Sequence, residues 1–190
     1  RADDKEAAPP PAPGYKSKSE IMAAFARGEV KPVPFARAKP AGVSLKAGVT
    51  YREVGGQVLQ LDLYAPEERP ADAKLPCVVL IHGGGWQGGG RLSGLSAMLP
   101  EMLKRGISVA SVEYRFIAEA TADHVVPPVK GPLHDAARAL QFIRSQAAAW
   151  NLDKTRIAAS GGSAGACTSL WLAFHPDLAD PASADPIARE

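Results

Sequence analysis

Seven consecutive, almost entirely apolar residues, LPCVVLI at 75–81, limit most strongly what this chain can fold into. Turn-forming residues bound the run, which is typical of a strand buried on both faces of a parallel sheet. ISVASV at 107–112 and RIAAS at 156–160 predict two further strands. Segments with helical periodicity alternate with these strands, at 95–104, 133–150 and 164–174. The alternation predicts an α/β fold, a mostly parallel sheet with helices on both faces.

The first part of the chain has a different composition. Residues 1–48 are predicted to form a Pro-rich leader and an irregular arm. AAPPPAPG at 7–14 indicates a stiff, extended leader, and the Pro-rich sequence at 29–48 indicates the arm. Between the leader and the arm, SKSE at 17–20 fits a capping box, so we expect a short helix that ends at Gly28. The chain starts at Arg1 without an initiator Met, which with the leader favours an exported protein, periplasmic or secreted. If that start is artificial, a cytoplasmic protein is the alternative.

The domain predicted at 49–190 is expected to open with a β-hairpin. Partly alternating apolar residues mark strands at 49–54 and 57–64. The pair Gly55-Gly56 between them supplies the positive φ angles that a two-residue hairpin turn needs.

Composition excludes several classes of function. The formal net charge is only +2 over 190 residues and no run of Lys and Arg forms a stripe, so we expect no nucleic-acid partner. No stretch approaches the roughly 18 consecutive apolar residues of a membrane span. Cys77 and Cys167 are interpreted as small buried hydrophobes rather than as disulfide or metal partners. No metal or organic cofactor is implied.

The sequence GGSAG at 161–165 carries the clearest chemical signal, because it matches G-x-S-x-G between a predicted strand and a predicted helix. A nucleophilic serine needs such a sharp turn to project its hydroxyl from the carboxyl edge of a sheet. Flanking glycines are required where a Cβ would collide with the neighbouring strand and helix. The N-terminus of the following helix favours developing negative charge. Ser163 is therefore the candidate nucleophile.

A second signal, HGGGW at 82–86, follows directly after the buried strand that ends at Ile81. Three glycines allow the backbone to approach a substrate and to turn N–H groups toward the oxyanion of an acyl-transfer intermediate. A phosphate-binding loop is the rival interpretation, but no Lys-Ser or Lys-Thr follows. His82, the first residue of the turn, is interpreted as an anchor of the loop rather than as a catalytic base.

Together, HGGGW and GGSAG, about 80 residues apart, resemble the fold-3 and hormone-sensitive-lipase-like carboxylesterases of the α/β-hydrolase superfamily. The resemblance is strongest to the BD-FAE group, which is related to feruloyl and acetylxylan esterases. It covers residues 49–175 and implies that 49–190 form the N-terminal portion of such a domain. Further matches are LDLYAP at 61–66, EYR at 113–115, HDAAR at 134–138 and NLD at 151–153.

The resemblance also implies roles for particular residues. In the family pattern, the oxyanion is bound by the backbone N–H groups of Gly84, Gly85 and Ala164. Trp86 is a candidate wall of the acyl pocket, with plain packing as the open alternative. Gly162 departs from many lipase-like relatives, which carry Asp there, and this favours the BD-FAE side.

The base that would activate Ser163 is missing from the candidate residues. In this superfamily an acidic residue and then a histidine follow the serine along the chain. His175 ends the helix that Ser163 opens, so it lies roughly 18 Å away at about 1.5 Å per residue. Proton transfer needs a reach of roughly 3 Å. His124 lies in a Pro-flanked loop. We therefore expect the acid and the histidine beyond Glu190, in a C-terminal remainder of the same polypeptide, so that only the N-terminal part of the fold is present.

The function predicted from these residues is a serine carboxylic-ester hydrolase whose partner is a small acyl or aryl ester. It would use a Ser-His-Asp/Glu triad and an acyl-enzyme intermediate, and this chain alone would be inactive. A peptidase or formamidase with the same machinery is one alternative. A non-catalytic interaction protein on the same scaffold is the other.

Overall fold

The computed structural model describes residues 14–29, 41–70, 72–93 and 95–190, and the chain divides into two compact units, Arg1–Ala36 and Arg37–Glu190. The first unit contains the helix α1 (Lys18–Ala26). Ser17 Oγ accepts a hydrogen bond from the N–H of Glu20, as a helix cap should. The leader at 1–13 and the arm at 30–40 lie outside the described residues.

The second unit is built on a sheet that has five strands within the described residues. The strands are β1 (Val43–Val54), β2 (Gln57–Pro66), β3 (Leu75–Ile81), β4 (Ser108–Val112) and β5 (Leu152–Gly161). The helices between and after them are α2 (Leu95–Lys104), α3 (Ile117–Ala122), α4 (Lys130–Ser145) and α5 (Ala164–Phe174). None of the described helices is long and apolar enough to cross a bilayer.

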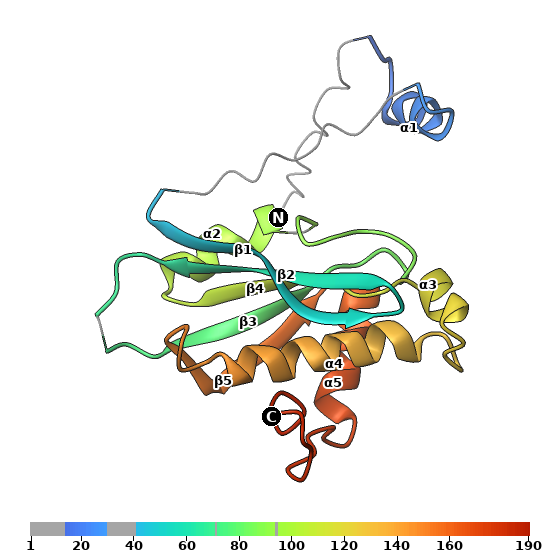
Figure 1. The fold of residues 1–190 in the computed structure, drawn as a ribbon. Helices are drawn as coiled ribbons and strands as arrows, with labels where there is room; N and C mark the ends of the chain where they lie inside the picture. The colour runs from blue at the N-terminus through green and yellow to red at the C-terminus, as the bar shows by residue number, and fades with distance from the viewer. Residues whose placement is uncertain (1–13, 30–40, 71, 94) are drawn as a thin grey trace, which may run out of the picture. The chain divides into compact units, whose positions relative to one another are not determined.

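The strands lie in the order β1-β2-β4-β3-β5 (Figure 1). β2 pairs antiparallel with β1 and with β4, whereas β3 pairs parallel with β4 and with β5. Four strands therefore run in one direction and β2 against them. This confirms the predicted mostly parallel sheet.

Helices cover both faces of the sheet. Alternate residues of its strands point to opposite sides, so each face contributes side chains to a separate core. Leu80 and Val109 face α2, whereas Val79 and Ala110 face α4. The apolar residues of α2 that form the first core are Leu95, Leu99 and Leu103. Those of α4 that form the second core are Ala136, Ala139 and Ile143. Leu172 places α5 on the same side as α4.

The irregular arm was predicted to continue to Gly48, and for residues 43–48 this was wrong. β1 begins at Val43 and pairs with β2 from Val43 opposite Pro66. The pairing is interrupted after Lys46 by a register shift, which breaks the apolar alternation that would have revealed the strand. At the shift, Gly48 has a φ of +65° and donates its N–H to the buried carboxylate of Asp62, 2.7 Å away.

Three further predictions need correction. The helix predicted at 133–150 runs from Lys130 to Ser145, and residues 146–150 form turns. The strand predicted at 156–160 already begins at Leu152. Cys77 is buried as predicted, but Cys167, on α5, is exposed. The predicted strand at 75–81 and the helices at 95–104 and 164–174 have the bounds observed.

Candidate active site

The nucleophile turn joins the end of β5 to the start of α5 and is strained. Ser163 is exposed and adopts φ 54° and ψ −119°, a backbone conformation that residues other than glycine rarely adopt. A Cβ added at Gly161 or at Gly165 would collide with the carbonyl oxygen of Ile81 at the end of β3. One at Gly162 would meet nothing within 4 Å. The two outer glycines are thus required by a close backbone approach, as the sequence predicts.

The triple-glycine loop after β3 lies against this turn. A Cβ added at Gly83 would be 2.8 Å from the carbonyl oxygen of Gly162 and 3.6 Å from Cβ of Ser163. Gly84 and Gly85 follow with φ angles of +113° and +62°. These left-handed conformations favour glycine. The two motifs, far apart in sequence, therefore meet at the carboxyl ends of the parallel strands.

Three backbone N–H groups at this junction are free to bind a ligand. Among the described residues, those of Gly84, Gly85 and Ala164 donate no hydrogen bond to a protein acceptor. Ala164 is the first residue of α5, where the positive end of the helix dipole favours negative charge. The arrangement suits an oxyanion, but the role of each N–H group stays a prediction.

A cavity of about 340 Å³ lies beside Ser163. Its lining comes from β3, the loops after it, α2 and the nucleophile turn: Leu80, Ile81, His82, Gly83, Ser93, Met98, Gly161, Gly162 and Ser163. Most of these residues are apolar or contribute backbone, so the space beside the nucleophile suits an apolar group.

His82 is buried and holds the loop rather than facing the turn. Its Nδ1 donates to the carbonyl oxygen of Gly83 at 2.8 Å, and its ring stacks on Tyr114 with centroids 4.1 Å apart. The Tyr114 hydroxyl donates to the carbonyl oxygen of His82 at 2.8 Å. Burial lowers the pKa of His82 and raises that of Tyr114 to about 12, so both rings are neutral near pH 7. His82 thus anchors the loop, as the sequence predicts, and Tyr114 is a partner that sequence reasoning missed.

Trp86, the last residue of the motif, is half-buried and is fixed to α5. Its indole N–H donates to Thr168 Oγ1 at 3.0 Å, and its ring packs against the core between the sheet and α4. Trp86 is absent from the described lining of the cavity beside Ser163. The packing alternative is therefore what the structure shows, and a role in an acyl pocket stays a prediction.

A largely buried ion-pair network connects the segment after β4 with β1 and α4. Arg115 binds both carboxylate oxygens of Asp135, at 2.8 and 3.0 Å, and reaches Asp123 at 2.8 Å. Arg52 of β1 binds the same Asp135 at 2.6 Å. Arg115 and Asp135 are 4% and 0% exposed, so they act as structural partners. Asp135 lies in the second turn of α4, which begins at Lys130.

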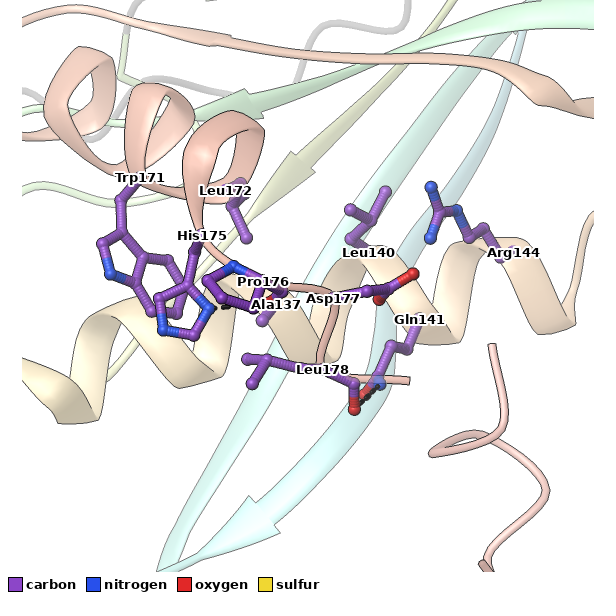
Figure 2. A pocket seen from close by; sticks show the side chains of 10 residues that line it. All are labelled: Ala137, Leu140, Gln141, Arg144, Trp171, Leu172, His175, Pro176, Asp177 and Leu178. Carbon is purple, nitrogen blue, oxygen red and sulfur yellow. Dashed lines mark hydrogen bonds between the residues drawn. The ribbon is translucent and has the colours of Figure 1, made fainter. Parts of the chain in front are cut away.

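His175 lies at the opposite end of α5 from Ser163 and is not placed to act as its base. His175 caps the opposite end of α5, where its ring contacts Trp171 at 4.2 Å and its Nδ1 donates to Pro176 at 2.8 Å. Figure 2 shows the rings of Trp171 and His175 lining a small pocket between α4, α5 and the segment after α5. The volume of this pocket is about 210 Å³. His124 follows α3 with a φ of +57°.

No metal-binding cluster appears among the described residues: nowhere do three side chains of His, Cys, Asp or Glu gather closely enough to hold an ion. Independently of this, the site combines the exposed hydroxyl of Ser163 on a strained turn with backbone N–H groups that donate to no described acceptor.

This fold, with its strained serine between β5 and α5, defines an α/β-hydrolase. The sequence profile of the BD-FAE family matches residues 61–180, which is well over half of the chain. The chain belongs to the BD-FAE family.

The relatives extend beyond this chain. The thermophilic esterase Est2 of Thermogutta terrifontis superposes with a TM-score of 0.61 at 26% identity, over 79% of this chain and 50% of that one. Gut esterase 1 of Caenorhabditis elegans is 32% identical over 66% of this chain and 22% of its own length. A probable isoprenylcysteine alpha-carbonyl methylesterase of Arabidopsis thaliana is 34% identical over 61% and 25%. The chain thus spans about half of the solved esterase and about a quarter or less of these curated relatives.

Proposed function

We propose that this chain carries the nucleophile and the oxyanion hole of a serine carboxylic-ester hydrolase that acts on small acyl or aryl esters. The observation that carries the proposal is the meeting of two remote motifs: the triple-glycine loop lies directly against the strained turn of Ser163. Folding needs alone give no reason to combine an exposed, strained serine with unpaired N–H groups. The names of the relatives support the same class, since three of them are esterases.

The proposed reaction begins with attack of Ser163 Oγ on the ester carbonyl carbon, as its proton passes to a histidine. The carbonyl oxygen becomes an oxyanion, which the N–H groups of Gly84, Gly85 and Ala164 stabilise. Collapse of this intermediate breaks the bond to the alcohol, which leaves with the proton. Water then hydrolyses the acyl-enzyme by the same steps and releases the acid and free Ser163.

The histidine and its acidic partner are proposed to come from sequence beyond this chain. Two observations support this. β5 has β3 as its only described neighbour and ends the sheet. Leu170 and Phe174 on α5 are 59% and 84% exposed. An open strand and an uncovered apolar helix face are surfaces that further elements of a fold would cover.

The test is release of p-nitrophenol from its acetate ester by the full polypeptide that contains this chain. We expect the Ser163→Ala variant to lose a factor of about 10⁴ or more in kcat. The control is Ser169→Ala, which removes another hydroxyl from α5 and should keep the rate. A variant lacking the nucleophile that still turns over at the wild-type rate would contradict the assignment.

Two assays separate the rivals. An interaction protein on this scaffold would turn over no ester. A peptidase or formamidase would hydrolyse the anilide or the formamide as well as the ester, whereas an ester hydrolase would act on the ester alone.

A further inference from the structure

A chain of hydrogen bonds connects the triple-glycine loop to the helix that Ser163 opens. The Trp86 indole N–H donates to Thr168 Oγ1 at 3.0 Å, and the Thr168 hydroxyl donates to the carbonyl oxygen of Ala164 at 2.9 Å. Trp86 directly follows Gly85, and Ala164 directly follows Ser163. The contact therefore joins the two segments that supply the proposed oxyanion donors.

Trp86 is held in a conformation that it would not adopt alone. Its φ is +56°, which is an outlier for a bulky side chain. Its carbonyl oxygen accepts a hydrogen bond from the N–H of Ile117 at 2.8 Å, so the residue is fixed at its backbone and at its indole. Strained residues persist where the surroundings over-determine them, and they cluster at functional sites.

Thr168 is committed to this contact. It is 0% exposed, and its hydroxyl has one partner to donate to and one to accept from. The next residue, Ser169, makes the same bond to the carbonyl four residues back, at 2.8 Å to Gly165. Ser169 thus shares the helical bond and lacks the link to the loop, which makes it a matched comparison.

We infer that Trp86 and Thr168 are a positioning pair for the oxyanion hole. Their hydrogen bond sets the N–H groups of Gly84 and Gly85 at a fixed place relative to that of Ala164. The inference rests on the proposed function, because a hole divided between two segments stabilises charge only if the segments keep their spacing. Small displacements of this kind weaken stabilisation of the transition state more than binding of the substrate.

The test compares esterase kinetics of four single variants and one double variant in the full polypeptide. Trp86→Phe keeps an aromatic ring and removes the donor, and Thr168→Val keeps the shape and removes the acceptor. We expect each to lower kcat about tenfold with KM within about twofold, since the donors shift without being lost. The kcat of the double variant should be no lower than that of the poorer single variant, because both substitutions break the same Trp86–Thr168 hydrogen bond. Thr168→Ser should restore kcat, and Ser169→Ala should leave it unchanged.

Thermal unfolding of each variant shows which ones are folded, and the kinetic comparison uses only those. Equal kcat in all variants, multiplicative losses in the double variant, or the same loss in Ser169→Ala would overturn the inference. A changed KM with an unchanged kcat would do so as well, because it indicates a substrate contact.

If the wild-type protein hydrolyses no ester, the proposed function fails, and the pair is judged by NMR on the same full polypeptide. The amide order parameters of Gly84 and Gly85 should then fall from about 0.85 toward 0.6 in Trp86→Phe and Thr168→Val, and not in Ser169→Ala. Unchanged order parameters would show that the bond does not hold the loop.

Discussion

The nucleophile turn at 161–165 and the triple-glycine loop at 82–86 are both rich in glycine, yet they are held in different ways. The turn is fixed by contact between backbones, since Gly161 and Gly165 pack on the carbonyl oxygen of Ile81 at the end of β3. The loop is fixed by side chains that come from elsewhere, with Tyr114 on one side and Thr168 on the other. The glycines that allow the first arrangement stand together in one short motif, so the sequence reveals them directly. The second depends on the rest of the fold, so its geometry can be tuned without changing a glycine.

Gly165→Ala tests the backbone contact of the nucleophile turn, and we expect it to have the largest effect on stability. Because the added Cβ would meet the backbone of Ile81 and also lie 3.0 Å from the carbonyl oxygen of His82, strand and helix must separate. We expect the free energy of unfolding in urea to fall by about 3 kcal/mol. Gly162→Ala is the control, since that Cβ meets nothing within 4 Å and should change stability little. Equal losses in both variants would show that the contact with Ile81 is not what requires the glycine.

In the triple-glycine loop, we expect substitution of Gly84 to change mainly the esterase activity. Gly84→Ala places a Cβ against the carbonyl of Gly88 at a φ of +113°, so the loop must move. We expect kcat for p-nitrophenyl acetate to fall about a hundredfold, as when an oxyanion donor is lost. Gly85→Ala has open space at a φ of +62° and should lose about 1 kcal/mol of stability instead. A larger kcat loss in Gly85→Ala than in Gly84→Ala would reverse our ranking of the two positions.

The same contrast explains what the sequence could predict. β3, α2 and α5 have their predicted bounds because an apolar run or helical periodicity between glycines is local information. The glycines and the serine of the nucleophile turn are local information as well, because they stand together in GGSAG. α3, with the sequence IAEATA, has no clear apolar periodicity and was missed. The supports of the loop were missed for another reason: Thr168 lies 82 residues from Trp86, and Tyr114 lies 32 residues from His82. Such pairs follow from the strand order, which periodicity does not specify.

A finer test of the side-chain supports compares two buried tyrosines that each donate to a backbone carbonyl. Tyr114 donates to His82 at 2.8 Å, whereas Tyr51 donates to Glu113 at 2.6 Å, at a carbonyl outside the loop. Changing either to Phe leaves a carbonyl unpaired and should lower the unfolding free energy by about 1 kcal/mol. Only Tyr114→Phe should also lower kcat, by several-fold. If both variants keep the wild-type kcat, the Tyr114 hydroxyl supports the fold and not the loop.

The smallest effect that we expect is a pH dependence from His82. Burial lowers the pKa of His82 in the folded protein, so at a pH just below about 6.5 the unfolded chain binds the proton and the folded chain does not. Stability therefore decreases as pH falls from 8 toward 5.5. His82→Asn retains a donor for the Gly83 carbonyl and removes the titration, so urea midpoints at the two pH values should lie closer together than in the wild type. His134, whose pKa is also lowered by burial, is the comparison, because its ring lies on α4 and not in the loop. If His134→Asn removes the pH dependence and His82→Asn does not, protonation in this range opens the contact of α4 with α5, and the triple-glycine loop is insensitive to it.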